Sequence, residues 1–462
     1  MKATDFAAQA RAGKVNLEKF YIEYFKQLRK IDAKYDCFIT ISEEEAFKQL
    51  SNLPRGKLYG VPVSVKDAIC TKDIPTTGGS KILKDYKPTF DASVIERIKA
   101  EGGVIVGKTC MDEFWLGGFS TNCAFKIPKN PIDLNRVTGG SSGGAGVIAR
   151  AIDGPHIAIG ESTGGSISCP ASFCGVNGLT PTYGRVPRYG LLDYACSLDK
   201  IGVLSKHMDD IALTMNVIAG FDERDMTSRP EKVLKLDNPQ PIKGMTIGLP
   251  KEYFGEGIDP EVSDRVTKSV KKLEQKGCEV KKINLKMSKY SLPAYYLVAM
   301  SEVSTNLAKL CGMRYSLELP LKRESFNEYF SRVRAIGFGT EAKRRIILGT
   351  YARMSGYRSK YYLQAMKVRT LIINDFKKAF KNVDLIAAPT MPVIAPRFDE
   401  VDKLTPLENY KMDVLTVAPN LAGIPMLSTP CGEVNKMPVG LHLMADHLEE
   451  NKLIDAGVAL NG

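Results

Sequence analysis

Two glycine-serine segments lie close together in this chain, and they constrain its fold more than any other feature. Residues 139–144 read Gly-Gly-Ser-Ser-Gly-Gly, and residues 163–166 read Thr-Gly-Gly-Ser. Such a composition is typical of a flexible linker. Apolar runs at residues 147–149 (Val-Ile-Ala) and 157–159 (Ile-Ala-Ile) interrupt it, however. We therefore predict buried core elements that are joined by functional loops.

A lysine and a serine in this part of the chain can act together on an amide. Serine is a weak nucleophile at its ordinary pKa, so Ser166 needs a base. Lys66 ends the apolar stretch 60–65, and burial can leave a lysine neutral and basic. The N–H groups beside Gly164 and Gly165 can bind a developing oxyanion. The nearest histidine, His156, lies on an expected turn, and we interpret it as structural.

Simpler interpretations of these residues stay open when each is taken alone. Taken by itself, Lys66 is better explained as a surface lysine at the end of a strand, and residues 163–166 are consistent with an ordinary glycine-rich turn. A phosphate-binding loop is disfavoured, because residues 139–144 lack the Gly-Lys-Ser/Thr ending of such loops. The ten cysteines and four histidines are dispersed, with no Cys-x-x-Cys pair. We therefore expect reduced thiols and no metal centre.

The order of apolar segments predicts an α/β protein. A strand ending at Lys66, a helix near residues 94–98 and a strand at 104–106 follow one another, which favours a largely parallel sheet. Strand patterns return at residues 245–250, 384–389 and 438–443, and residues 290–381 are mostly helical in pattern. One compact unit with a helical insertion fits this order better than two independent domains.

Charge and hydropathy narrow the class of protein. Lys plus Arg is 64 and Asp plus Glu is 52, a net charge of +12. We attribute this charge to a basic surface. The sequence has no basic tract interleaved with aromatic residues, so it does not indicate direct RNA recognition by this chain. The sequence contains no stretch of about 18 apolar residues, so we predict no membrane span. The first residues lack an apolar signal core, so we expect a cytoplasmic protein, or an organellar one if a leader has been removed.

The motifs together resemble the amidase signature family. The resemblance runs from residues 60–67 (Gly-Val-Pro-Val-Ser-Val-Lys-Asp) through both glycine-serine segments to Gly432 and beyond. It implies an α/β fold with a large mixed central sheet, helices on both faces and a mostly helical insertion. It also implies one amidase domain over residues 1–462. Its expected parts are an N-terminal helical segment (about 1–54), a core (about 55–230 and 384–462) and a more helical region (about 245–381).

The same resemblance implies catalytic roles. Ser166 is the nucleophile that forms an acyl ester, and Lys66 is the base. Ser142, a serine typically held by a cis peptide in this family, is the expected relay that passes the proton between them. The expected oxyanion hole is formed by Thr163, Gly164 and Gly165 together with the N–H of Ser166.

Later segments resemble one branch of the family, the glutamine-hydrolysing subunits of tRNA-dependent amidotransferases. These segments are residues 107–114, 181–186, 348–351, 367–372 and 420–425. The branch implies that Arg345 binds the α-carboxylate of glutamine and that Asp413 binds its α-amino group. The alternative for both is a surface ion.

The branch also implies partners. A B subunit is expected to use ATP and Mg²⁺, and a small C-type or equivalent subunit is expected beside it. Misacylated tRNA, Glu-tRNA(Gln) or Asp-tRNA(Asn), is expected to be bound mainly by the complex. No cofactor is expected in this chain itself.

The sequence departs from the family beside the nucleophile. The family usually reads Asp-Thr-Gly-Gly-Ser-x-Arg, whereas Ser162 and Ser168 occupy the two charged positions here. We hypothesise that these serines replace a charge pair with a neutral hydrogen bond, because loss of both partners costs less than loss of one. Two other functions stay open: a stand-alone hydrolase of small amides, and a catalytically weak scaffold that organises a tRNA complex.

Overall fold

A single mixed β-sheet runs through the protein. The computed structural model describes residues 1–231, 235–236, 238–315 and 317–461. The sheet has 11 strands in the order β1-β3-β2-β4-β6-β5-β10-β11-β9-β7-β8. In chain order the strands are β1 (Phe38–Ile41), β2 (Pro62–Lys66), β3 (Val104–Thr109), β4 (Ile157–Ser162), β5 (Asn177–Thr180), β6 (Lys200–Ser205), β7 (Thr246–Pro250), β8 (Glu279–Ile283), β9 (Leu385–Pro389), β10 (Met426–Val434) and β11 (Met437–Ala445).

The direction of the strands corrects one expectation. β2 lies parallel to both β3 and β4, and β7 lies parallel to both β8 and β9, as the strand–helix–strand order predicts. Antiparallel ladders join β4 to β6, β6 to β5, β5 to β10 and β10 to β11. The prediction of a largely parallel sheet is therefore wrong, because the middle of the sheet is antiparallel. The mixed sheet implied by the family resemblance is confirmed.

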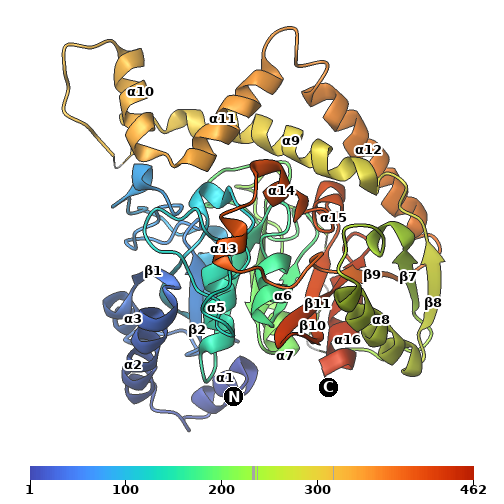
Figure 1. The fold of residues 1–462 in the computed structure, drawn as a ribbon. Coiled ribbons are helices and arrows are strands. Elements are labelled where there is room, and N and C mark those ends of the chain that lie inside the picture. The colour runs from blue at the N-terminus through green and yellow to red at the C-terminus, as the bar shows by residue number, and fades with distance from the viewer. Residues whose placement is uncertain (232–234, 237, 316, 462) are drawn as a thin grey trace.

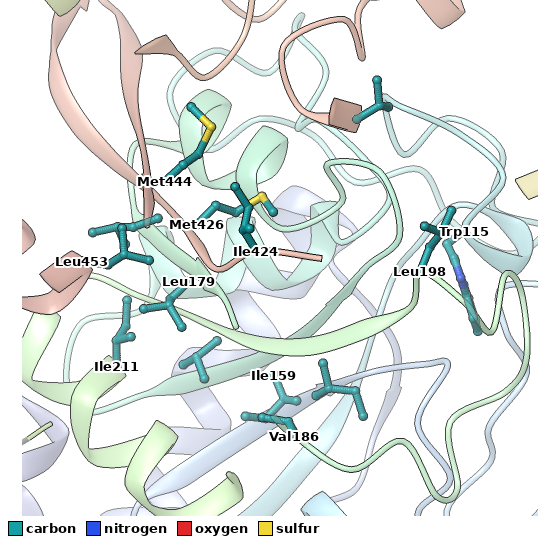
Figure 2. Packing of buried hydrophobic residues seen from close by; sticks show 14 of the residues in the cluster. Trp115, Ile159, Leu179, Val186, Leu198, Ile211, Ile424, Met426, Met444 and Leu453 are labelled. Carbon is teal, nitrogen blue, oxygen red and sulfur yellow. The ribbon is translucent and has the colours of Figure 1, made fainter. Parts of the chain in front are cut away.

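Both faces of the sheet are buried. Along β3, Val104 and Val106 enter one hydrophobic core while Ile105 enters the other, as alternation along a strand requires. Helices α2 (Leu17–Tyr35) and α5 (Gly143–Ala151) cover the first face. On the second face, Ile159 of β4, Leu179 of β5 and Ile211 pack into the larger core (Figure 2). Helices therefore cover both faces, as predicted.

Four long helices form a layer across one end of the molecule (Figure 1). They are α9 (Ser291–Asn306), α10 (Phe326–Gly337), α11 (Thr340–Arg353) and α12 (Tyr362–Ala379). α11 and α12 both pack on α9. At Gly349 of α11 any side chain would collide with the Met300 carbonyl oxygen, since a Cβ would lie 1.8 Å from it. The absence of a side chain thus lets α11 lie directly on α9.

The remaining helices pack around the sheet. They are α1 (Ala3–Arg11), α3 (Glu43–Leu50), α4 (Ser93–Ala100), α6 (Ser168–Cys174), α7 (Met208–Ile218), α8 (Pro260–Gln275), α13 (Phe398–Val401), α14 (Pro406–Lys411), α15 (Val417–Ala422) and α16 (Glu450–Asn461). In the described parts of the chain no helix is long and apolar enough to cross a membrane. The sheet takes strands from each of the three regions expected from the sequence, and the division into those regions stays a prediction.

Candidate active site

The two glycine-serine segments meet beside the end of β2. The N–H of Ser142 donates to the carbonyl oxygen of Ser166 at 3.2 Å, which joins the two loops. Each loop leads directly into a helix: α5 begins at Gly143, and α6 begins at Ser168. Lys66 is the last residue of β2. The fold therefore brings together the lysine and both loops, as the sequence predicts.

The structure corrects which serine contacts the lysine. Lys66 Nζ donates to Ser141 Oγ at 2.8 Å, and the peptide bond between Gly140 and Ser141 is cis. Ser142 Oγ instead donates to the backbone oxygen of Glu161 at 3.0 Å. The assignment of the relay and of the cis peptide to Ser142 is therefore wrong in its position, because Ser141 occupies that place. Two adjacent serines differ only in which way the backbone turns them, and the sequence does not show this.

Lys66 lies wholly inside the protein. Its side chain is 0% exposed, and its amine also donates to Glu161 Oε2 at 2.9 Å and to the Glu161 carbonyl at 3.0 Å. The amine lies 5.5 Å from the centre of the Trp115 ring. Burial lowers the pKa of Lys66, while the charge of Glu161 opposes that shift. A lysine in this setting is a stronger candidate for a neutral base than a surface lysine. We call Lys66, Ser141, Glu161 and Ser166 the buried relay.

The loop that carries Ser166 has room only for glycines. A Cβ on Gly164 would lie 2.4 Å from the Tyr295 hydroxyl, and one on Gly165 would lie 2.4 Å from Thr416 Oγ1. In the described chain, the N–H groups of Gly164, Gly165 and Ser166 donate no hydrogen bond to another residue. These donors are available to an oxyanion, as the sequence predicts. Ser166 itself is only 7% exposed.

The hypothesis of a neutral hydrogen bond between Ser162 and Ser168 is wrong. Both side chains are 0% exposed, and within the described residues neither hydroxyl has a hydrogen-bond partner. A serine hydroxyl lies one bond beyond Cβ, so two serines bridge a much shorter gap than an aspartate and an arginine do. The acidic group of this region is instead Glu161, one residue before Ser162, and it pairs with Lys66.

The helical layer supplies Arg345. Its side chain is buried, with Nε donating to Glu341 Oε1 at 2.8 Å and Nη1 donating to the Tyr194 hydroxyl at 3.1 Å. The guanidinium also lies 5.3 Å from the centre of the Tyr296 ring and 5.2 Å from that of Tyr410. Nη2 has no hydrogen-bond partner in the described residues. The alternative of a surface ion is excluded for Arg345.

Asp413 contacts one of the tyrosines that surround Arg345. Its Oδ2 accepts a hydrogen bond of 2.6 Å from the Tyr296 hydroxyl, so Tyr296 contacts both Asp413 and Arg345. Burial raises the pKa of Asp413 to about 6, and the positive charge of Arg345 limits that rise. We call Arg345 and Asp413, with Tyr194, Tyr296 and Tyr410, the aromatic pocket.

A glycine loop connects the aromatic pocket to the buried relay. The Gly118 carbonyl accepts a hydrogen bond of 2.8 Å from the N–H of Gly140, the residue before Ser141. A Cβ on Gly118 would lie 3.7 Å from Asp413 Oδ1. Tyr295, next to Tyr296 in α9, lies directly against Gly164. The structure thus brings the predicted site residues together from the sheet and from the helical layer.

Sequence reasoning missed several residues of the site. Glu161 had one usable signal, an acidic residue at the end of an apolar strand and five residues before the nucleophile. The tyrosines of the aromatic pocket are ordinary helix and loop residues in the sequence, without a pattern that marks them. His156 was interpreted as structural, and the structure agrees: Tyr24 and Ser64 occupy its ring nitrogens at 2.7 and 2.9 Å.

The fold and the buried lysine–serine pair define an amidase-type hydrolase, and the chain belongs to the Amidase family. The family model matches residues 21–454. This confirms the resemblance seen in the motifs.

Individual relatives point to one branch. The chain is 44% identical over 453 residues to the A subunit of Glutamyl-tRNA(Gln) amidotransferase from Halothermothrix orenii, covering 97% of this chain and 94% of the relative. The protein of the same name from Archaeoglobus fulgidus is 45% identical over 449 residues, with 96% of both chains covered.

Solved structures agree on the fold. The crystal structure of the A subunit of Glutamyl-tRNA(Gln) amidotransferase from Thermotoga maritima matches with a TM-score of 0.80 at 35% identity, covering 97% of this chain and 92% of that one. A 6-aminohexanoate cyclic dimer hydrolase matches with a TM-score of 0.86 at 21% identity, over 100% of this chain and 96% of the other. At 21% identity, the second match supports a shared fold and nothing further.

Proposed function

We propose that this chain is the glutamine-hydrolysing subunit of a tRNA-dependent amidotransferase. The observation that carries hydrolysis is the 2.8 Å hydrogen bond from Lys66 to Ser141, beside the loop that holds Ser166. The names of relatives at 44–45% identity over nearly the whole chain support the amidotransferase branch. The expectation drawn from the sequence motifs agrees with those names.

In the proposed acylation step, Ser166 Oγ attacks the side-chain amide carbon of glutamine. Its proton passes to Ser141, and the proton of Ser141 passes to Lys66, which becomes an ammonium. The carbonyl oxygen of the substrate becomes an oxyanion that the N–H groups of Gly164, Gly165 and Ser166 stabilise, with Thr163 completing the hole. One such donor contributes roughly 3 kcal/mol to lowering a barrier of this kind.

The proton then returns along the same path. Lys66 gives it back through Ser141 to the amide nitrogen, the carbon–nitrogen bond breaks, and ammonia leaves. A glutamyl ester of Ser166 remains. Water, deprotonated by the same relay, attacks this ester, and glutamate is released with Ser166 restored. One water and one glutamine thus yield one ammonia and one glutamate.

Selection of glutamine is assigned to the aromatic pocket. The free Nη2 donor of Arg345 suits the α-carboxylate, to which a guanidinium can bind in a bidentate manner. Asp413 Oδ1, which accepts no hydrogen bond from any described residue, suits the α-ammonium. Opposite charges at adjacent points match a free amino acid, whereas a simple amide has neither group.

The ammonia is proposed to serve a partner. A B subunit would use ATP and Mg²⁺ to activate the acyl group of Glu-tRNA(Gln) or Asp-tRNA(Asn), and a small C-type subunit would accompany it. In this proposal the misacylated tRNA is bound mainly by the assembled complex. It follows the branch of the relatives, while the described residues supply the chemistry of glutamine hydrolysis.

The test is glutamine hydrolysis by the purified chain, alone and with a co-expressed B subunit, beside Ser166→Ala. We expect ammonia release that rises with the partner and is lost in Ser166→Ala. Hydrolysis of aryl or aliphatic amides that ignores the partner would instead indicate a stand-alone amide hydrolase. Absence of hydrolysis in every state would indicate a scaffold.

A further inference from the structure

Glu161 is a buried carboxylate that contacts the same Lys66 amine as Ser141 does, and the proposed reaction does not yet use it. It lies near the end of β4, five residues before Ser166. Its Oε2 lies 2.9 Å from Lys66 Nζ and its own backbone oxygen lies 3.0 Å from the same atom. Both side chains are 0% exposed, so no bulk water competes for the amine.

The geometry of these contacts assigns every direction around the amine. A neutral amine has two N–H donors and one lone pair, arranged as three directions around nitrogen. Glu161 offers two acceptors, and an acceptor can face only an N–H. The third contact is the Ser141 hydroxyl at 2.8 Å, which can donate as well as accept. The ammonium form of Lys66 donates to all three partners, Ser141 included. In the neutral form the lone pair is left for Ser141, the one partner with a proton to give.

A second carboxyl group indicates that Glu161 is the ionised member of this region. Thr163 Oγ1 lies 3.0 Å from Glu161 Oε1 and 2.7 Å from Asp199 Oδ1, yet it has a single proton to donate. Burial raises the pKa of both carboxyl groups, that of Asp199 to about 8, and the charge of Lys66 limits the rise for Glu161. A protonated Asp199 donates to Thr163, and Thr163 then donates to Glu161. This order leaves the charge on Glu161, next to Lys66.

We propose that Glu161 is a positioning residue for Lys66. Its carboxylate and its carbonyl hold the amine so that the lone pair faces Ser141, and its negative charge stabilises the ammonium that forms when Lys66 takes the proton. The bond changes are those of the acylation step above, with Glu161 unchanged in covalent structure. The inference rests on the proposed hydrolysis but not on which amide is the substrate.

The test compares Glu161→Gln with Glu161→Asp in the complex. We expect Glu161→Gln to lower kcat for glutamine at least about tenfold while KM changes less than about threefold. The acid limb of the pH profile should move to lower pH, because burial lowers the pKa of Lys66 and its largest opposing charge is then gone, while the weaker influence of Asp112 and Asp199 stays in place. Glu161→Asp keeps the charge, so its acid limb should stay near that of the wild type while kcat falls.

A matched control comes from a buried carboxylate outside the site. Glu450, 2% exposed, accepts a hydrogen bond of 2.9 Å from the N–H of Thr182 and lies 3.7 Å from Arg185. Glu450→Gln should leave the acid limb in place. A merely structural ion pair at Glu161 would lower activity without moving the limb, and that result, or an unchanged kcat, would overturn the inference.

The labelling rate of Ser166 by a fluorophosphonate separates the two proposals. This probe reports activation of the serine without any substrate amide, so its pH dependence can be compared in wild type and both Glu161 variants. If glutamine is not hydrolysed but the labelling profile shifts in Glu161→Gln, only the proposed substrate is wrong. If glutamine is hydrolysed and both profiles stay in place, only the role of Glu161 is wrong.

Discussion

The buried relay and the aromatic pocket adjoin each other but are built in different ways. The buried relay comes from the sheet: Lys66 ends β2, Glu161 lies in β4, and the serines follow from tight loops. The charged residues of the aromatic pocket come from the helical layer and the segment after α14, with Arg345 on α11 and Asp413 beyond Lys411. Lys66 and Glu161 of the relay pair with each other, whereas the charges of the pocket lie among tyrosines, with Arg345 also paired to Glu341.

This difference separates reaction from selection. Lys66, Ser141 and Glu161 are fully buried, and Lys66 is hydrogen-bonded to the other two, whereas Ser166 is 7% exposed, so we expect the relay to act on any amide that reaches Ser166. The pocket leaves one donor of Arg345 and one acceptor of Asp413 unpaired within the described residues, which supports the proposal that a zwitterionic ligand binds there. A change in the pocket should alter which substrate is used, and a change in the relay should alter every substrate.

Arg345→Ala is expected to produce the largest difference between hydrolysis of glutamine and hydrolysis of a simple amide. Truncating one partner of a buried charged contact costs about 2–5 kcal/mol, so kcat/KM for glutamine should fall by about 30-fold to several thousand-fold. Hydrolysis of an aliphatic amide without an α-carboxylate should change much less. Steady-state kinetics on both substrates measures the effect, and the melting temperature checks that α11 remains folded.

Arg345→Lys is the companion variant. It keeps the charge but loses the planar fork, so it should recover only part of the glutamine activity. The separation would be broken if Arg345→Ala reduced both substrates equally, because the arginine would then support the relay.

A smaller, pH-dependent effect is expected at Asp413. It must be ionised to hold an α-ammonium, and its pKa is raised to about 6. As pH falls through about 6, protonation should lower wild-type kcat/KM for glutamine, and above that pH the contribution should be complete. Asp413→Asn should lower kcat/KM roughly thirtyfold at neutral pH, for a charged hydrogen bond of about 2 kcal/mol.

The profile of Asp413→Asn provides the check. It should lack the loss of activity near pH 6 that the wild type shows, because the titrating group is gone. An unchanged pH profile in the variant would assign that limb to another residue.

The smallest effect concerns the two unpaired serines near the relay. Ser162→Ala and Ser168→Ala each remove a buried hydroxyl without a partner in the described chain, so the free energy of unfolding should rise by up to about 1 kcal/mol. Ser64→Ala is the matched control, since Ser64 Oγ is hydrogen-bonded to His156 Nε2 at 2.9 Å, and it should lower stability by about 1 kcal/mol. Chemical denaturation measures all three. Equal losses in all three would show that Ser162 and Ser168 do have partners.

Local patterns predicted much of the fold and part of the site. Apolar runs located β2, β7, β9 and β11, and the helical periodicity located α8 and the layer formed by α9–α12. Lys66, Ser166 and the glycines between Thr163 and Ser166 were recognisable as a set through the resemblance to the amidase signature family, although each alone fits a simpler interpretation. The direction of the central strands was missed, since a strand pattern does not say which way the chain turns between strands.

The rest of the site depends on contacts that are distant in sequence. Glu161 and Lys66 are 95 residues apart, and Tyr296 and Asp413 are 117 apart. Pairing of Ser162 with Ser168 was inferred from the loss of two charges, but neither hydroxyl has a partner among the described residues. The choice between Ser141 and Ser142 depended on one peptide bond, which residue identity does not reveal.

The most direct test compares two neighbouring serines, Ser141→Ala and Ser142→Ala, by ammonia release from glutamine in the co-expressed complex. We predict that Ser141→Ala loses activity about 100-fold or more, as expected for removal of a proton-transfer group. Ser142→Ala should stay within about threefold of the wild type, since its hydroxyl contacts only the Glu161 carbonyl among the described side-chain contacts. The opposite result, an active Ser141→Ala and an inactive Ser142→Ala, would contradict the relay from Lys66 through Ser141 to Ser166.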